Sequence, residues 1–409
     1  MTSRRSPIVR HALGLAVALA ALIGSPSGSQ AREWNEVLAE ARGQTVYFNA
    51  WAGDPQTNAF IAWVGEEAEE RFGVEVEHVK LTDTAEAVAR VLAEKSAGRD
   101  QGGSVDLVWI NGANFLAMRQ QDLLFGPFAQ DLPNWRYVDT TNKPSNVIDF
   151  TVPTEGYESP WHMAQIVYVY DSARIAAYDL PRSMPAMLEW VKENPGRLTH
   201  PTVRDFLGAT FLKQALYELA PDPAVLQEPA TDATFAATVE PLWAWYDALR
   251  PHLWRGGREF PANGPAQRQL MSDGEIELYA AFNPAEAAVA IRLGTLPRTA
   301  RVYVPDGGTI GNTSFVAIPY NAAHKEAAMV VADFLLSPEV QARAQDPEQL
   351  GNFTVLDLAK LDPAQQALFE RPADAVAVPT NQEMGSMLLE PHPSWMTRIV
   401  EAWEQRYLP

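Results

Sequence analysis

The chain has 409 residues, of which 51 are acidic and 32 basic, for a formal net charge of −19, and it contains no cysteine. The negative charge disfavours binding to nucleic acid and to anionic membrane surfaces. The absence of cysteine excludes disulfides, thiolate metal sites and a cysteine nucleophile. The length is sufficient for two lobes, each with a well-buried core.

The N-terminal segment has the pattern of a secretory signal peptide. Basic residues precede an apolar run from residue 12 to 23, and small residues follow as far as Ala31. This apolar run is too short to span a bilayer comfortably. We therefore expect residues 1–31 to be removed, leaving a monomeric periplasmic protein that does not insert into the membrane. The general and twin-arginine export routes both stay open, because Pro7 stands where the twin-arginine motif prefers a bulky apolar residue.

The first part of the mature chain alternates between strand and helix patterns. Asp54-Pro55 is a typical helix start, because aspartate caps the first turn and proline lacks the N–H that would stay unbonded there. The alternation predicts a parallel sheet covered by helices. The predicted strands are residues 44–51, 74–79 and 105–110, and the predicted helices are residues 54–71, residues 82–96 with Thr82 or Asp83 as cap, and a helix from Asn114.

A stretch rich in β-branched and aromatic residues, 165–170, predicts a strand that crosses from one lobe to the other. A return strand is predicted at 313–319, after a glycine-rich turn at 307–311. Other predicted elements are helices at 185–194, 205–219, 239–249, 324–336, 363–369 and 394–406, and strands at 274–282 and 301–304. We expect two α/β lobes with the ligand between them. One comprises residues 32–161 and 312–375, and the other residues 162–311 and 376–409.

Three motifs near the return strand, at residues 315–319, 325–328 and 334–341, resemble the C-terminal signature of bacterial ABC-importer periplasmic solute-binding proteins of the extracellular class. More narrowly, the chain resembles the YnjB-type branch, commonly assigned to thiamine-type import. The matching stretches are residues 51–58, 103–114, 157–165, 195–212, 263–270, 282–287 and 306–319.

This resemblance implies a two-lobed α/β fold. Each lobe would be a helix-covered mixed sheet, and crossing hinge strands would join the two lobes. It also implies that the lobes close on a small solute and deliver it to an inner-membrane ABC permease. No catalytic residue, cofactor or metal is expected.

Candidate ligand-binding residues follow from the strand ends, because ligands of open α/β sheets bind beyond the carboxyl ends of the strands. The aromatic side chains suit a flat ring, a sugar face or an organic cation, and the asparagines supply neutral hydrogen bonds. More ordinary roles stay open: Asp54 as a helix cap, Trp109 as core and Asn111 as a turn residue. The expected site residues are Trp51, Asp54, Trp109, Asn111, Asn114, Trp161, Phe282, Asn283 and Asn312.

Three functions stay open at this point. The first is binding of a thiamine-like organic cation, with Asp54, Glu155, Glu158 and Glu383 as possible partners of the positive charge. The second is binding of a sugar or sugar phosphate, and the third is a secreted lyase or hydrolase. Ferric-ion binding through paired tyrosines is conceivable. The enzyme is the least favoured, because the chain has no G-x-S-x-G, S-x-x-K or H-E-x-x-H motif.

Overall fold

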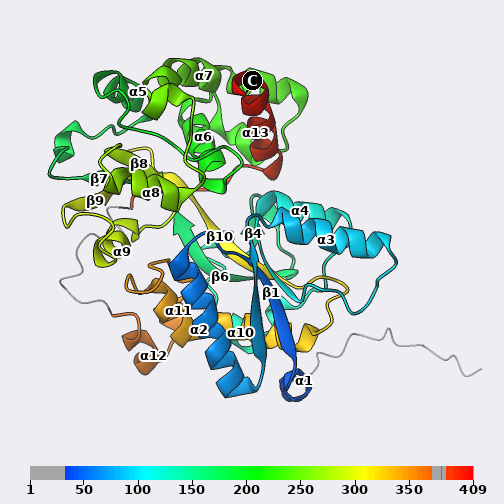
Figure 1. The fold of residues 1–409 in the computed structure, drawn as a ribbon. Helices are drawn as coiled ribbons and strands as arrows, with labels where there is room; N and C mark the ends of the chain where they lie inside the picture. Colours follow the sequence, from blue (N-terminus) through cyan, green and yellow to red (C-terminus); the bar gives the residue numbers. More distant parts are fainter. Residues whose placement is uncertain (1–32, 371–378, 380–383, 409) are drawn as a thin grey trace, which may run out of the picture. The chain divides into compact units, whose positions relative to one another are not determined.

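The computed structural model describes residues 33–370, 379 and 384–408. The expected signal peptide, residues 1–31, and Glu383 lie outside the described residues. The described residues belong to one compact α/β unit with two main sheets. Figure 1 shows the long strands β6 and β10 side by side in the middle of this unit.

The larger sheet has the strand order β11-β10-β3-β1-β2, and β6 pairs with β10. Strand β1 is parallel to β2 and β3, as the alternating pattern predicted, whereas β10 is antiparallel to β3 and β6. The sheet is therefore mixed. Its strands are β1 (Thr45–Trp51), β2 (Glu75–Leu81), β3 (Leu107–Ile110), β6 (Glu158–Gln165), β10 (Thr309–Ala317) and β11 (Met387–Leu388).

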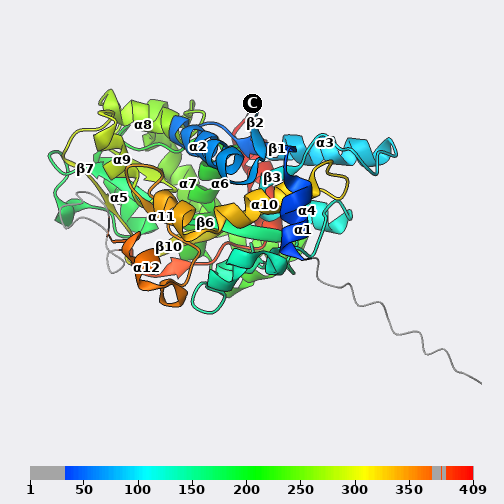
Figure 2. The ribbon, with the colours of Figure 1, turned by 90° about the horizontal axis from the view of Figure 1, so that it is seen from below.

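Helices bury apolar stripes against this sheet and form two core clusters. In α3, for example, Ala87, Val88 and Val91 are buried at helical spacing. Figure 2 shows α1 beside α10, on which it packs. The helices of the first cluster are α1 (Trp34–Ala41), α2 (Pro55–Phe72), α10 (Lys325–Leu335) and α11 (Pro338–Gln345). Those of the second cluster are α3 (Ala85–Ser96) and α4 (Gly112–Gln120).

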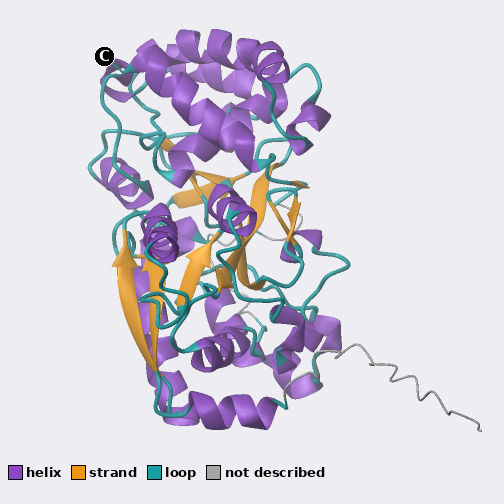
Figure 3. Cartoon of the chain, turned by 90° about the vertical axis from the view of Figure 1, so that its right-hand side faces the viewer, coloured by secondary structure: helices purple, strands orange, loops and turns teal. Residues whose placement is uncertain are grey.

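The smaller sheet has the order β8-β7-β9, and its strands are antiparallel. Helices flank the strands, as Figure 3 shows. The strands are β7 (Val167–Asp171), β8 (Leu278–Ala281) and β9 (Ala300–Tyr303). The helices are α5 (Met184–Glu193), α6 (Phe206–Leu219), α7 (Asp232–Leu249), α8 (Gly264–Ser272), α9 (Glu286–Arg292) and α13 (Pro393–Tyr407). A short helix α12 (Pro363–Ala367) and a hairpin of β4 (Ile148–Asp149) and β5 (Val152–Pro153) complete the α-helices and β-strands of the described residues.

The predicted crossing strand is interrupted at Ile166, which separates β6 of the larger sheet from β7 of the smaller one. The Ile166 amide donates to the carbonyl of Ile310 at 2.9 Å, so the chain stays bonded to β10 between the sheets. Strand β10 itself begins at Thr309 and includes Gly311, which we expected in a turn. The predicted lobe boundaries stay a prediction.

Three helices begin elsewhere than expected. Helix α3 begins at Ala85, after Thr84, rather than after Thr82 or Asp83, and α7 begins at Asp232 rather than near residue 239. The earlier start of α7 comes from a capping box, in which Thr231 and Thr234 bond each other's backbone N–H groups.

Helix α4 begins at Gly112 rather than at Asn114. Gly112 has a φ of +55°, and a Cβ there would lie 2.8 Å from the ring of Phe150. The position therefore requires glycine both for its backbone conformation and for space.

Candidate ligand-binding site

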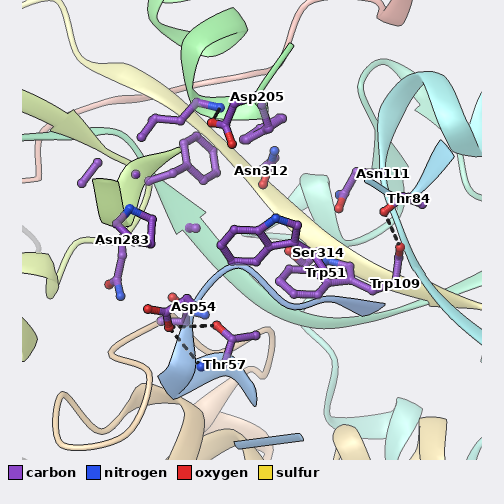
Figure 4. Close-up of a pocket in the computed structure, with 18 of the residues that line it drawn as sticks. Trp51, Asp54, Thr57, Thr84, Trp109, Asn111, Asp205, Asn283, Asn312 and Ser314 are labelled. Atoms are coloured by element: carbon purple, nitrogen blue, oxygen red, sulfur yellow. Dashed lines mark hydrogen bonds between the residues drawn. The ribbon is translucent and has the colours of Figure 1, made fainter. Parts of the chain in front are cut away.

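A cavity of about 400 Å³ is lined by residues that follow strands of both sheets (Figure 4). The end of β1 contributes Trp51 and Asp54, the end of β3 contributes Trp109 and Asn111, and Phe282 follows β8. Strand ends thus converge at the cavity. Of the nine expected site residues, these eight line it: Trp51, Asp54, Trp109, Asn111, Asn114, Phe282, Asn283 and Asn312.

The two long antiparallel strands, β6 and β10, supply one wall of the cavity. Asn312 stands opposite Ala164, and Ser314 stands opposite His162. All four residues line the cavity, because residues two apart on a strand share one face of the sheet. The strands that lead from one sheet to the other therefore also form part of the cavity wall.

A β-bulge next to this wall explains why Trp161, the ninth expected site residue, does not line the cavity. The ladder shifts between Ser314 and Phe315, so that Phe315 pairs with Pro160 and Trp161 is the extra residue on β6. Trp161 is only 1% exposed and packs in the core, with its ring centre 6.1 Å from that of Phe60. The expectation that Trp161 faces the ligand is therefore wrong.

His162 lies at the cavity instead of Trp161. The residue is 4% exposed, and the centre of its ring lies 4.1 Å from that of Trp161 and 5.5 Å from that of Trp109. Burial lowers the pKa of His162 to about 3, so the ring is neutral at physiological pH. Within the described part of the chain its Nδ1 has no hydrogen-bond partner.

Aromatic rings form much of the remaining wall. Trp51 and Trp109 meet edge to face at 6.5 Å, and Phe206 meets Phe282 at 5.1 Å. Phe150 also lines the cavity and has a φ of +45°, which is unusual for a residue other than glycine. Such a wall suits a flat or partly apolar ligand.

An ion-pair chain occupies one side of the cavity. The Nη2 atom of Arg268 lies 3.5 Å from Asp54 Oδ1, and its Nη1 atom lies 3.2 Å from Glu286 Oε1. The Tyr279 hydroxyl donates to the same Glu286 oxygen at 2.9 Å. Asp54 also caps α2, since it accepts from the amides of Gln56 and Thr57, as its sequence context predicted. Two carboxylates thus already neutralise the Arg268 guanidinium.

Asp205 lines the other side and has no such partner. It caps α6 by accepting from the Leu207 amide at 2.9 Å, and no ion pair joins it within the described residues. Burial, together with the charge of Asp83, raises the pKa of Asp205 to about 6. Sequence reasoning placed a helix here but did not select Asp205, although an aspartate before an apolar helix is the signal that identified Asp54.

Two asparagines present their oxygens to the cavity, because their nitrogens are bonded elsewhere. Asn111 Nδ2 donates to the Thr313 carbonyl at 2.6 Å, and Asn312 Nδ2 donates to Glu390 Oε1 at 3.0 Å. Figure 4 shows the Asn312 oxygen on the side facing Trp51. Asn283, by contrast, uses both ends internally, with the Leu350 carbonyl and the Ala285 amide. The polar ends of Asn111 and Asn312 that stay open are therefore acceptors.

Two of the other expected carboxylates do not reach the cavity. Glu155 pairs with Arg119 at 2.6 Å, and Glu158 is buried without lining the cavity. Burial raises the pKa of Glu158 well above its usual range, which favours the neutral acid. Among the described residues, no group of three or more acidic or histidine side chains is placed to hold a metal ion. No helix among the same residues is both long and apolar enough to cross a membrane.

Comparison with known proteins gives the family. A model of the bacterial extracellular solute-binding protein family matches residues 63–373. Protein YnjB of Escherichia coli (strain K12) is 42% identical over 379 residues, which cover 93% of this chain and 95% of that protein. The chain belongs to the bacterial extracellular solute-binding proteins. It is accordingly the substrate-binding component of an ABC importer rather than an enzyme.

Solved structures of other solute-binding proteins share the two-lobed α/β fold at low sequence identity. A putative spermidine/putrescine ABC transporter protein of Listeria monocytogenes has a TM-score of 0.62 at 15% identity and covers 89% of this chain and 98% of its own. AfuA of Actinobacillus pleuropneumoniae, with fructose-6-phosphate bound, has a TM-score of 0.59 at 13% identity with the same coverage. A ferric binding protein of Campylobacter jejuni has a TM-score of 0.61 at 13% identity and covers 88% and 98%. These similarities establish the fold of this solute-binding protein and leave its ligand open.

Proposed function

We propose that this periplasmic solute-binding protein captures a thiamine-like organic cation in the cavity and delivers it to an inner-membrane ABC permease. The protein acts as a monomer and performs no chemistry on its ligand. One lobe comprises residues 32–161 and 312–375, and the other residues 162–311 and 376–409. The ligand residues are those lining the cavity, with Asp205 and His162 added to the set expected from sequence.

The observation that carries this proposal is the chemistry of three polar groups that face the cavity. Asp205 is a carboxylate without an ion-pair partner among the described residues, and Asn111 and Asn312 present amide oxygens. All three are hydrogen-bond acceptors. A ligand with N–H donors or a positive charge complements them, whereas a ligand that brings only acceptors does not.

The aromatic wall supports the same ligand class. Trp51 and Trp109 stand at the cavity with their rings at right angles, and Phe282 lies on the side of the smaller sheet. Aromatic faces attract cations and stack on flat rings. A ligand that combines a positive charge with an aromatic ring uses both the rings and the acceptors.

A sugar phosphate is the less favoured candidate. Its phosphate requires a free cation or backbone donors. Both arginines that line the cavity are already paired, Arg268 with Asp54 and Glu286 and Arg204 with Glu404. A phosphate near Asp205 would also meet repulsion from the carboxylate. A neutral sugar stays compatible with Trp51 and the asparagines, so sugars belong among the test compounds.

Closure in this proposal is a population shift between open and closed forms. Strands β6 and β10 connect the two sheets and bend as the lobes move. The ligand favours the closed form because it contacts residues of both lobes only there.

The test is thermal unfolding of the mature protein after refolding, which removes co-purified ligand. The panel contains thiamine and its phosphates, choline, spermidine, putrescine, sugars, fructose 6-phosphate and ferric citrate. A ligand at about 100 times its dissociation constant adds about 2.7 kcal/mol of stability, which raises the melting temperature by a few degrees in a chain of this size.

We expect thiamine or another organic cation to raise the melting temperature. A shift with sugars or fructose 6-phosphate alone would contradict the proposed ligand class while keeping the importer function. The absence of any shift would contradict it as well, and would make a search for enzymatic turnover worthwhile.

A further inference from the structure

A buried ion pair stands behind the cavity wall without lining the cavity. Lys213 Nζ in α6 lies 2.6 Å from Glu390 Oε2, just after β11, and the two side chains are 0% and 2% exposed. The Lys213 ammonium lies 4.8 Å from the ring centre of Phe150 and 4.9 Å from that of Phe206. Both rings line the cavity, so they separate this ammonium from any ligand.

Stability alone gives little reason for such a pair. Removing two charges from water costs several kcal/mol per ion, and replacing a buried pair by apolar side chains of similar size is often neutral or stabilising. The best-attested benefit of buried ionic groups is the selection of one specific arrangement. The relevant question is therefore what arrangement Lys213 and Glu390 select.

Glu390 contacts a residue that does line the cavity. Its Oε2 atom faces Lys213, and its Oε1 atom accepts from Asn312 Nδ2 at 3.0 Å. An ionised carboxylate can only accept hydrogen bonds. The amide nitrogen of Asn312 must therefore point toward Glu390, and the amide oxygen is left on the cavity side. Burial raises the pKa of Glu390, and the Lys213 ammonium, at 2.6 Å from its Oε2 atom, opposes this effect by favouring the ionised carboxylate that accepts from Asn312.

We propose that the Lys213–Glu390 pair positions Asn312, so that this wall presents an oxygen and selects ligands with N–H donors or positive charge. Lys213 and Glu390 are positioning residues, since they act on the ligand only through Asn312. The inference rests on the proposed function, because it assumes a ligand that needs an acceptor at this wall. The Thr313 carbonyl accepts from Asn111 Nδ2, so the Asn111 oxygen also points toward the cavity. The wall thus presents two amide oxygens as hydrogen-bond acceptors.

The variant that tests the proposal is Lys213→Met combined with Glu390→Met, which keeps side-chain length and removes both charges of the pair. Without Glu390 the Asn312 amide is free to turn its nitrogen toward the cavity. We expect the affinity for thiamine, measured by calorimetry, to fall about tenfold, the value of one hydrogen bond to a charged group.

Two comparisons separate positioning from a general structural effect. Arg406→Met with Asp247→Asn removes an exposed ion pair of 2.5 Å that does not contact Asn312, and it should leave the affinity unchanged. In an Asn312→Leu background, the Lys213 and Glu390 substitutions should cause no further loss, because the group that they position is absent. A further loss of similar size in that background would overturn the proposal.

A second measurement needs neither ligand nor a variant of the pair. The side-chain amide protons of Asn312, assigned by their loss in Asn312→Leu, should exchange slowly with solvent in the wild-type protein. Fast exchange would show that Glu390 does not hold the amide, and would overturn the proposal even if the paired variant failed to fold.

The outcomes distinguish the proposal from the proposed function. If thiamine binds the wild type and the Lys213→Met/Glu390→Met variant equally well, the positioning role is wrong and the ligand class stands. If fructose 6-phosphate binds and thiamine does not, the ligand class is wrong. In that case the proposed selection for ligands with N–H donors is wrong as well. Slow exchange of the Asn312 amide protons would still support the orientation of that side chain.

Discussion

Asp54 and Asp205 occupy equivalent places in the two halves of the site, and the difference between them is instructive. Each caps a helix whose first turn faces the cavity, α2 for Asp54 and α6 for Asp205. Figure 4 shows them on opposite sides of Trp51. Asp54 lies 3.5 Å from the Arg268 guanidinium, whereas no ion pair joins Asp205 within the described residues. The same local signal thus produces one carboxylate that is ion-paired and one that is open to a ligand.

The substitution expected to change ligand affinity most is at Asp205, the carboxylate without an ion-pair partner among the described residues. Asn caps a helix as well as Asp does, so Asp205→Asn should remove the charge while keeping α6. We expect the affinity for thiamine to fall about tenfold or more, as for loss of a charged hydrogen bond. Calorimetric titration measures this change. An unchanged affinity would place the positive group of the ligand elsewhere in the cavity.

The matched control is Asp362→Asn, which removes the same charge from the cap of α12, a residue that does not line the cavity. Its affinity should equal that of the wild type. Folding of the Asp205 variant is checked by its melting temperature. Because burial raises the pKa of Asp205, the ionised carboxylate destabilises the free protein above about pH 6. Asp205→Asn should therefore be at least as stable as the wild type at neutral pH.

The pH dependence of binding sharpens the same comparison. A pKa of about 6 means that Asp205 is mostly protonated at pH 5 and mostly ionised at pH 7. A cation binds the ionised form, so its affinity should rise about tenfold from pH 5 to pH 7 and then level off. His162 stays neutral over this range, since its pKa is about 3.

Calorimetry at a series of pH values measures this dependence, and Asp205→Asn should largely abolish it. If the variant kept the full pH dependence of the wild type, another group would be responsible.

The smallest effect is expected at Asp54. Asp54→Asn keeps the cap of α2 and leaves Arg268 paired with Glu286 at 3.2 Å. Because Asp54 is already paired with Arg268, we expect the affinity for thiamine to change less than about threefold, as for the loss of a weak, exposed ion pair. A loss equal to that of Asp205→Asn would show that the two carboxylates act alike on the ligand and would remove the distinction drawn above.

Local signals in the sequence account for much of the fold and of the candidate site. The Asp54-Pro55 pair located the start of α2, and the ends of β1 and β3 located Trp51, Trp109 and Asn111. These features depend on neighbouring residues and on the general rule that ligands bind beyond strand ends. They are therefore accessible without knowledge of tertiary contacts.

The remaining features depend on contacts between distant segments. The bulge that places Trp161 in the core and His162 at the cavity arises from the register of β6 against β10. No local pattern around Trp161 encodes that register. Similarly, the availability of Asp205 follows from the position of Arg268, which pairs with Asp54 and Glu286 instead. Which charge stays open is thus decided by tertiary packing rather than by helix capping.

The bulge also has a spectroscopic consequence, because it aligns Trp161 with a series of aromatic rings. Trp51 lies 6.5 Å from Trp109, and Trp109 lies 5.0 Å from Trp161, which in turn lies 6.1 Å from Phe60. Excitation absorbed by the buried indole of Trp161 is close enough to migrate to Trp109 and then to Trp51 at the cavity. A ligand that quenches Trp51 would therefore also lower the fluorescence that arises from excitation of the buried Trp161. For such a ligand, the intrinsic fluorescence of the protein would report occupancy of the cavity without a label.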